Sequence, residues 1–330
     1  MKHNMRHGKK VVAVMLILMM TLSLAACGGG GNDASSDGSA TLTIAHQYGM
    51  AYAPLEVMKQ QKLIEKHYDG VEVEWSTLNS GSAINEGFIS GDIDVGAMGV
   101  APAITGVTSG VPYKICSNMS AQPHKIMTNN PNIKSLKDIT DEKIALVNIG
   151  SIQHILLAMA AEEQLGDAHA LDENISAMSH PDGMTALLSG SVDCQLTTSP
   201  YVFKEAEEEG ISEVEALESV WPSGNSFIVA VASTDLQKNN PELYDAVVAA
   251  LAEAIDYINN NKAEAAKMLC EAEDVDAATM ETWLNDKDCV YSTETKGVMD
   301  MATFMDKEGF LENDGPDSFS DLAFDNVKGN

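Results

Sequence analysis

Residues 88–94 read Phe-Ile-Ser-Gly-Asp-Ile-Asp, and residues 187–193 read Leu-Leu-Ser-Gly-Ser-Val-Asp. Each stretch predicts a helix that ends on a left-handed glycine, followed by a tight turn into a buried strand. A proline follows each strand, at Pro102 and at Pro200, before a loop that leads to another helix. A match this short can arise by chance, but the ordered spacing favours two lobes built on the same plan.

The residues around both stretches alternate between short β-branched runs and longer helical periods. The first set comprises LTIA (42–45), a helix over 53–67, VEVEW (71–75), a helix through 84–89 and IDVGAM (93–98). The second set comprises KIALV (143–147), a helix over 152–164, ISAM (175–178), a helix near 184–188 and SVDCQL (191–196). Such alternation is typical of βαβ units on a mainly parallel sheet. We therefore expect an α/β protein with two similar lobes.

The chain beyond these two sets is expected to return to the first lobe. A strand is predicted over 227–232 and an amphipathic helix over 241–260, followed by helices over 262–273 and 277–285. Three methionines of the C-terminal tail have helical spacing, which favours core packing over a metal–thioether site. They are Met299, Met301 and Met305.

The composition excludes two broad classes of protein. With 330 residues the chain exceeds what one hydrophobic core usually serves, so two domains are expected. Asp and Glu number 49 against 20 Lys and Arg, a formal charge of −29, and only 5% of the residues are aromatic. Nucleic-acid binding needs a basic face, so no nucleic-acid partner is expected. A hydrophobic fraction of 45% is enough for a packed interior and argues against disorder.

Residues 1–26 have the pattern of a lipoprotein export signal. Positively charged residues precede an apolar run over 11–24, whose length suits a signal-peptide core and falls short of a membrane span. The run ends in LAAC (24–27), which resembles a bacterial lipobox and makes Cys27 the expected lipidation site. An ordinary signal-peptidase cut and an uncleaved anchor are the alternatives. We expect an exported protein, lipid-anchored to the outer face of the cytoplasmic membrane.

Residues 27–40 contain no large apolar side chain and are expected to form a Gly- and Ser-rich tether of about 20 Å root-mean-square reach. The globular body therefore begins near Thr41. The signal holds four of the positive charges, among them Arg6, the only arginine of the sequence. The mature protein would carry 16 lysines against 49 acidic residues, a charge of −33, and no arginine.

Four cysteines follow the expected lipidation site: Cys116, Cys194, Cys270 and Cys289. Their spacings match no zinc or CxxC pattern, so no thiolate metal site is expected. Cys270 and Cys289 flank a helical stretch and could pair outside the cell, although the sequence alone does not define their distance.

Motifs of the common enzyme classes are absent from the sequence. It contains no GxSxG elbow, no HExxH, no Walker loop and no GxGxxG after a strand. Four histidines lack a carboxylate or cysteine at ligand spacing and are interpreted as packing or pocket residues. They are His46, His124, His154 and His180. No catalytic residue, metal or cofactor is predicted.

Small polar residues stand where two helices are predicted to begin. Ser80-Gly81-Ser82 leads into a helix of the first lobe, and Gly150-Ser151 leads into a helix of the second. Such residues commonly do no more than cap helices. Free N–H groups and the positive end of the helix dipole also suit an anionic or strongly hydrogen-bonding ligand. Because such turns lie at the carboxyl ends of parallel strands, two facing lobes would place them on one cleft.

Several motifs together resemble a known family. After the lipobox come YAPL (52–55) with KLIEK (62–66), SGDIDVG (90–96), GVP (110–112), SLKDI (135–139) with KIA (143–145), and ALLSGSVD (186–193). In this order they are similar to the solute-binding lipoproteins of ABC importers. Within these proteins they resemble most the NMT1-like branch that handles nitrate, sulfonates, taurine and the pyrimidine precursor of thiamine. The resemblance covers about 41–250 and weakens toward the C-terminus.

The resemblance implies a type II periplasmic-binding-protein fold of two lobes, with a ligand cleft between them and two hinge crossovers. It places the first lobe at 41–121 plus 226–330 and the second at 122–225, with crossovers near 118–124 and near 221–226. In such a receptor the lobes close on one small solute, and the closed form docks on a membrane permease with its ATPase. Closure shifts an open–closed equilibrium, so the function needs no catalytic group. A monomer is expected.

Carried over position by position, the resemblance implies a set of pocket residues in the loops that follow the strands. They are Gln47, Tyr48, Ser80, Gly81, Ser82, Val100, Asn118, Gly150, Ser151, His154, His180, Ser199 and Trp221. Two have plain alternatives, since Trp221 could fill a gap between the lobes and His180 stands in a favourable turn sequence.

These observations predict a receptor that captures a small-molecule solute and delivers it to an ABC permease. Many receptors clamp anions with a bidentate guanidinium. Without arginine, a sulfonate- or nitrate-like anion, or a thiamine-precursor-like compound, must rely on helix N-termini, hydroxyls and lysine. A neutral or cationic ligand held by His and Trp221 is the alternative. Two other functions are kept open: a ligand-binding partner of a membrane sensor, and a thiamine-pyrimidine synthase, whose cysteine-rich iron motif has no counterpart here.

Overall fold

The structure is a computed structural model, which describes residues 40–330. The predicted signal peptide, the lipidation site Cys27 and the tether up to residue 39 lie outside the described residues. Within the described part of the chain, no helix is both long enough and apolar enough to cross a membrane.

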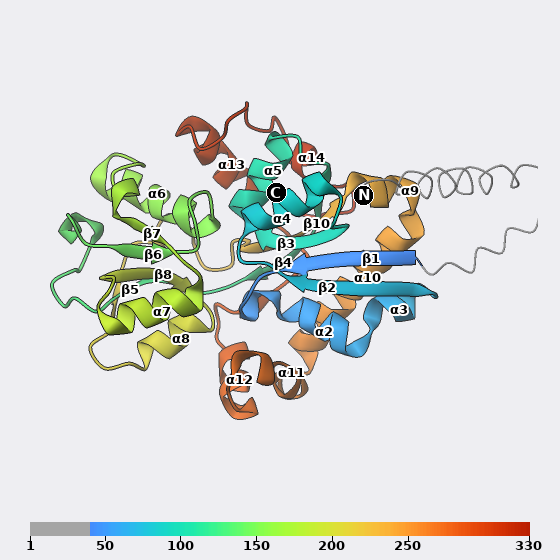
Figure 1. The fold of residues 1–330 in the computed structure, drawn as a ribbon, viewed down its shortest axis with the longest axis horizontal. Coiled ribbons are helices and arrows are strands. Elements are labelled where there is room, and N and C mark those ends of the chain that lie inside the picture. The colour runs from blue at the N-terminus through green and yellow to red at the C-terminus, as the bar shows by residue number, and fades with distance from the viewer. Residues whose placement is uncertain (1–39) are drawn as a thin grey trace, which may run out of the picture. The chain divides into compact units, whose positions relative to one another are not determined.

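Two β-sheets organise this part of the chain (Figure 1). The first, in the order β11-β4-β10-β3-β1-β2, comprises β1 (Ala40–His46), β2 (Val71–Thr77), β3 (Val95–Gly99), β4 (Tyr113–Ala121), β10 (Ile228–Ser233) and β11 (Val290–Tyr291). The second, in the order β7-β6-β8-β5-β9, comprises β5 (His124–Thr128), β6 (Ile144–Leu146), β7 (Ile175–Ala177), β8 (Cys194–Thr198) and β9 (Ser212–Val214). We call the first sheet with its helices lobe 1 and the second sheet with its helices lobe 2. The predicted α/β class is confirmed.

Helices pack on both sheets. Lobe 1 carries η1 (Met50–Tyr52), α2 (Ala53–Gln61), α3 (Leu63–His67), α4 (Gly81–Ser90), α5 (Val100–Thr108), α9 (Thr234–Asn239), α10 (Pro241–Asn260), α11 (Lys262–Leu269), η4 (Glu271–Glu273), α12 (Ala277–Leu284), α13 (Val298–Lys307) and α14 (Phe319–Leu322). Lobe 2 carries η2 (Leu136–Asp138), α6 (Ile152–Leu165), η3 (Asp172–Asn174), α7 (His180–Ser189) and α8 (Tyr201–Ala206). The C-terminal helices therefore pack with the elements of lobe 1.

The two Ser-Gly-x-x-Asp motifs occupy equivalent places in the two sheets. β1 lies between β2 and β3, and β6 lies between β7 and β8, with every one of these pairs parallel. The Asp94 carboxylate accepts a hydrogen bond from the Thr43 N–H at 2.9 Å, and the Asp193 carboxylate accepts one from the Lys143 N–H at 2.8 Å. In both lobes the acidic side chain therefore ties the entry of one strand to its neighbour. The predicted likeness of the lobes is confirmed.

Three of the differences between the predicted and the observed element boundaries have an identifiable local cause. The predicted helix over 53–67 is broken at Lys62, whose φ of 52° is left-handed. α7 begins at His180 rather than near 184, because the Ser179 hydroxyl caps it. β8 begins at Cys194 rather than at 191, because the intervening residues form the turn that ends in Asp193.

Buried sulfur-containing side chains contribute to a core that is continuous across both lobes. Met301 and Met305 are fully buried and Met299 packs at the edge, which confirms their expected role in packing. All four cysteines of the described residues are free thiols. The disulfide considered between Cys270 and Cys289 is therefore not formed in this structure.

The chain passes between the lobes twice. The first passage joins β4 to β5 through Gln122 and Pro123, and the second joins β9 to β10 through residues 215–227. Trp221 lies in the second passage, where only 1% of its surface is exposed. Its ring packs so close to Gly297 of lobe 1 that a Cβ there would lie 3.1 Å from the indole.

Side chains away from the two passages also join the lobes. The ring of Phe203 on α8 stacks on Trp283 of α12, with 5.6 Å between centroids and 20° between planes. Beside this stack, Lys204 Nζ of lobe 2 donates to the Glu273 carbonyl oxygen of lobe 1 at 2.9 Å. A separate contact joins His169, between α6 and η3, to the residue after α13. These contacts therefore join the lobes at two places away from the passages.

Candidate functional site

A cavity between the lobes lies where the parallel strands of both sheets end. The segments after β1, β2 and β3 reach it from lobe 1, and those after β6 and β7 and the end of β8 reach it from lobe 2. Its volume is about 40 Å³, which is space for a few water-sized groups. It is lined by Gln47, Tyr48, Ala51, Tyr52, Asn79, Gly81, Gly99, Pro102, Val147, Ser151, Ile152, Gln153, Ser179, His180, Thr198, Phe227 and Ile228. Open parallel sheets commonly bind ligands at this edge.

A wider depression forms the mouth of this cavity. It shares Tyr48, Asn79, Val147 and Ser179 with the cavity and is completed by Ser80, Asn148, Met178, Pro181 and Asp182. The mouth therefore draws residues from both lobes, as the cavity itself does.

Three helices begin at the cavity, each with a serine at its N-cap. Ser80 accepts a hydrogen bond from the N–H of Ala83 in α4 at 3.2 Å, and Ser151 accepts one from the N–H of His154 in α6 at 3.2 Å. Ser179 caps α7 in the same way. Each cap satisfies one N–H of a first turn and leaves others without an intrahelical partner. Three positive helix ends therefore converge on one small cavity.

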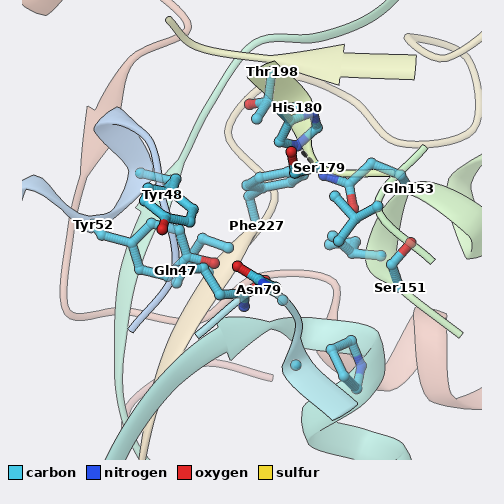
Figure 2. A pocket seen from close by; sticks show the side chains of 17 residues that line it. Gln47, Tyr48, Tyr52, Asn79, Ser151, Gln153, Ser179, His180, Thr198 and Phe227 are labelled. Carbon is cyan, nitrogen blue, oxygen red and sulfur yellow. Dashed lines mark hydrogen bonds between the residues drawn. The ribbon is translucent and has the colours of Figure 1, made fainter. Parts of the chain in front are cut away.

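His180 and Gln153 form a buried polar pair in the cavity wall (Figure 2). The Gln153 amide nitrogen donates to His180 Nε2 at 3.1 Å. The neutral ring then carries its proton on Nδ1, which has no hydrogen-bond partner among the described residues. Burial lowers the pKa of His180 to about 4, so the ring is uncharged near neutral pH. The wall thus contains an unpaired N–H donor on a neutral ring.

Lobe 1 and lobe 2 present different side chains to the cavity. Figure 2 shows Gln47, Tyr48 and Tyr52 on one side and Ser151 and Gln153 on the other. Tyr48 is 52% exposed, whereas Tyr52 is buried. The lobe 1 wall is therefore partly aromatic, and the lobe 2 wall is mainly polar.

The cavity has polar groups but no formal charge. Among the residues that line it in the described part of the chain, none is Asp, Glu, Lys or Arg. Asp182, at the mouth, is the first charged side chain on the way out. Electrostatic attraction inside the cavity therefore comes from helix ends and hydrogen-bond donors rather than from a countercharge.

The structure brings some of the predicted pocket residues together here. Those that line the cavity are Gln47, Tyr48, Gly81, Ser151 and His180, and Ser80 lines its mouth. Ser82 lies just outside, where its hydroxyl accepts a hydrogen bond from Asn148 Nδ2 at 3.3 Å. Because Ser82 belongs to lobe 1 and Asn148 to lobe 2, this bond joins the lobes beside the cavity.

The remaining predicted residues lie elsewhere. Val100 is fully buried in the lobe 1 core. Asn118 Nδ2 donates to the carbonyl oxygen of Ser292 at 2.6 Å, and the Ser199 hydroxyl donates to the side chain of Gln122. These polar groups are committed to bonds within the protein next to the passages.

Three further predicted residues also stand away from the lining. Gly150 and His154 lie behind the cavity in lobe 2, where the Gly150 N–H donates to His154 Nδ1 at 3.1 Å. Trp221 fills space at the second passage, which agrees with the alternative that it fills a gap between the lobes. Its Nε1 has no hydrogen-bond partner among the described residues.

Several polar or aromatic lining residues were not predicted from the sequence: Tyr52, Asn79, Gln153, Ser179, Thr198 and Phe227. Asn79 and Ser179 precede helix starts, so the pattern of capping residues could have identified both. Phe227 lies at the end of the second passage, and no local pattern indicates that it returns to the cavity.

A second cavity of about 210 Å³ lies in lobe 1 on the other side of Tyr48 and Tyr52. Residues of α2, including Glu56 and Lys59, line it together with Glu273 and other residues from α11 to α12. Among residues 40–330, no group of three or more His, Cys, Asp or Glu side chains is arranged to hold a metal ion.

Known proteins are similar to this chain, either in sequence over most of its length or in fold. A Bacillus subtilis (strain 168) protein, whose name assigns it to the binding of aliphatic sulfonates, is 24% identical over 256 residues and 76% of each chain. The alkanesulfonate-binding protein of Xanthomonas axonopodis pv. citri, solved with bound MOPS, has a TM-score of 0.70 at 18% identity, over 83% of this chain and 95% of that one. The nitrate-binding protein of Synechocystis PCC 6803 has a TM-score of 0.60 at 18% identity, over 72% of this chain and 68% of that one.

These likenesses confirm the periplasmic-binding fold of two lobes that the motifs predict. The model of the NMT1-like family matches residues 35–272. That range includes both Ser-Gly-x-x-Asp motifs and all three capped helix starts of the cavity. The chain therefore belongs to the NMT1-like family.

Proposed function

We propose that this protein is an extracytoplasmic receptor that binds a small anion of the sulfonate type between its lobes and delivers it to an ABC permease. The observation that carries the proposal is the cavity itself: three serine-capped helix N-termini from two lobes converge on a small space without charged side chains. Such helix ends stabilise negative charge and offer N–H donors.

The chemistry of the wall supports an anion over a cation. The unpaired Nδ1–H of His180 and the first-turn N–H groups are donors, whereas a cation would need acceptors or a carboxylate. A sulfonate presents three acceptor oxygens and stays ionised throughout the physiological range. The names of the similar proteins, which bind sulfonates or nitrate, support the same class of solute.

The two passages support closure as the working motion. We propose that lobe 1 spans 41–121 plus 226–330, that lobe 2 spans 122–225, and that the passages between β4 and β5 and between β9 and β10 act as hinges. Contacts made only in the closed form then shift the open–closed equilibrium when solute binds. A closed receptor is the form that a permease would distinguish from an empty one.

Membrane attachment is a separate part of the proposal. The lipobox LAAC (24–27) supports a lipid anchor on Cys27, with the tether leading to lobe 1. Replacing the thiol, as in Cys27→Ser, should release the protein from the membrane fraction of the producing cell. Retention of a processed Cys27→Ser protein in that fraction would argue against the anchor.

Calorimetric titration of the full chain with ethanesulfonate tests the binding proposal, with nitrate, a thiamine-pyrimidine precursor and a small aromatic amine as the other probes. Ethanesulfonate should bind, and Ser151→Val should abolish its binding by removing the α6 cap and placing methyl groups in the cavity. The control is Ser233→Val, which removes the equivalent cap of α9 far from the cavity. Binding of the amine alone, or equal affinity for wild type and Ser151→Val, would refute an anion site.

A further inference from the structure

A chain of hydrogen bonds runs from the Gly150–Ser151 turn beside the cavity to the contact between the lobes. The Gly150 N–H donates to His154 Nδ1 at 3.1 Å, and His154 Nε2 lies 3.2 Å from Asp172 Oδ1. The other Asp172 oxygen, Oδ2, lies 2.8 Å from His169 Nδ1. Finally, His169 Nε2 lies 3.0 Å from the carbonyl oxygen of Glu308. The first four residues belong to lobe 2 and the last to lobe 1.

The donors and acceptors along this chain define the protonation of both rings. Because His154 Nδ1 accepts from a backbone N–H, that ring donates from Nε2 and is satisfied in its neutral form. His169 is different, since a carboxylate faces one nitrogen and a carbonyl faces the other. Both of its nitrogens must donate, so both bonds form together only when the ring is an imidazolium.

The surroundings agree with this assignment. The Glu308 carbonyl and Asp172 raise the pKa of His169, whereas burial lowers the pKa of His154. The ring of Phe310, from lobe 1, lies 4.6 Å from the His169 ring at an interplanar angle of 32°, whereas it meets the His154 ring edge-on at 5.3 Å and 86°. At His169 this aromatic contact favours a cationic ring over a neutral one.

The remaining charged groups near His169 come from three segments. Its own segment supplies Asp167 and Asp172. α6 supplies His154 and, further along, Glu162. The end of α13 supplies Lys307 and the Glu308 side chain, which pair with each other, and Lys307 also lies 3.9 Å from Glu162. The acidic groups outnumber the one lysine, and that lysine is already paired, so the local field favours a proton on His169.

We propose that His169 and Asp172 are positioning residues of the receptor, which hold the Gly150–Ser151 turn at the cavity and fasten it to lobe 1 through the Glu308 carbonyl. This inference rests on the proposed function. It adds that closure is coupled to protonation of His169, so that solute affinity rises as the pH falls. The cavity, the turn and the lobe contact thereby act as one unit.

The direction and size of the pH dependence of solute affinity follow from the linkage between proton binding and closure. The bridged, closed form binds the His169 proton more tightly than the open form. The stabilisation of the closed form by this proton is therefore complete at low pH, and it is lost as the pH rises through the raised pKa of His169. Because the His169 side chain is 47% exposed, water screens part of the effect. Affinity near pH 6 should therefore exceed affinity near pH 8 by about two- to fivefold.

The first test is calorimetric titration of the full chain with ethanesulfonate near pH 6 and near pH 8. His169→Gln keeps an amide donor but cannot titrate, so it should lose the pH-dependent part of the affinity. Asp172→Asn should also lower the affinity and weaken its pH dependence. The matched control is His67→Gln, because His67 pairs with Glu253 on the surface of lobe 1 and touches no lobe contact. An unchanged pH dependence in His169→Gln would overturn the inference.

A second test needs no solute and separates this inference from the proposed function. Trp283 belongs to the other lobe contact, so the ¹⁹F resonance of 5-fluorotryptophan at this position reports closure of the whole molecule. In the ligand-free full chain, acid should increase the closed-state signal in wild type and in His67→Gln but not in His169→Gln. If ethanesulfonate fails to bind at either pH, the proposed solute class is wrong, while the ¹⁹F titration still decides the inference. Identical titrations in all three proteins would refute it.

Discussion

Gly99 of lobe 1 lies directly against Ile152 of lobe 2 in the wall of the cavity. A Cβ added to Gly99 would stand 2.8 Å from Ile152 Cγ2 and 3.0 Å from its Cβ. The backbone of Gly99, with φ −57° and ψ 151°, suits any residue, so the glycine is needed for space and not for conformation. The missing side chain is therefore what allows the lobes to approach this closely.

Gly99→Ala should weaken ethanesulfonate binding by about fivefold or more, because the added methyl group obstructs closure at a cost of about 1–3 kcal/mol. The free energy of unfolding should change little, since the open form accommodates the methyl group. Ile152→Ala removes the opposing Cγ2 and provides a double-mutant cycle. Adding Gly99→Ala to Ile152→Ala should cost little further affinity. Full additivity in calorimetry would show that the two residues do not meet in the bound form.

The stack of Phe203 on Trp283 should favour the closed form. Phe203→Ala is expected to weaken ethanesulfonate binding by about two- to twelvefold, which corresponds to an aromatic pair of about 0.5–1.5 kcal/mol. The control is Phe324→Ala, because Phe324 packs edge-on against Tyr244 within lobe 1, at 5.1 Å. That variant should lose stability without losing affinity. A Phe203→Ala protein with wild-type affinity would mean that the stack persists in the open form.

Glu205 is a fully buried carboxyl of lobe 2 whose oxygens have no hydrogen-bond partner among the described residues. Burial raises the pKa of Glu205 to about 8, so the folded state holds its proton. Stability is then complete below the unfolded pKa near 4.5 and is lost as the pH rises through about 8. Glu205→Gln should remove this loss and stabilise the protein near pH 8 by on the order of 3 kcal/mol, with little effect near pH 4.

Urea unfolding followed by circular dichroism at both pH values measures this effect. Glu207→Gln, on the exposed end of the same helix, is the matched control and should behave as wild type. Equal stabilisation by Glu205→Gln at both pH values would point to a packing effect instead of proton binding.

His180 should make the protein sensitive to acid. Burial lowers the pKa of His180 to about 4, so the folded state excludes a proton that the unfolded chain accepts near pH 6.5. The contribution of the neutral His180 ring to stability is complete above about pH 6.5. It is lost as the pH falls toward 4, by up to about 3 kcal/mol. His180→Gln should reduce the stability near pH 7 and flatten this part of the pH profile in urea unfolding. His67→Gln should keep the wild-type slope, and an equally steep slope in His180→Gln would disprove the assignment.

Much of the fold could be predicted because its signals are local. Gly91 and Gly190 end their helices with φ values of 79° and 73°, as the repeated motif indicates. Strand β4 was not predicted, because buried polar residues, including Ser117 and Ser120, interrupt its apolar pattern. Their hydroxyl groups bond to the backbone inside the protein, for example Ser120 to the Ala51 carbonyl at 2.9 Å. The partner of Ser120 is distant in the chain and leaves no local signal.

The residues of the candidate site also fall into those with a local sequence signal and those without one. Ser80 and Ser151 were predicted because a capping serine before a helix is a property of neighbouring residues. Gln153 and Phe227 were missed because their place in the wall depends on how the lobes meet. Asn118 and Ser199 have suitable chemistry but bond to partners beside the passages.

The sequence by itself determined the two similar lobes, the helix starts at the cavity and the absence of arginine from residues 40–330. Each of these depends on composition or on contacts within a few residues. Only the tertiary structure decided that Gly99 meets Ile152, that His169 bridges to the Glu308 carbonyl, and that the cavity lining has no charge. These features arise where segments of the two lobes far apart in the chain come together, and short-range physical preferences carry no information about such encounters.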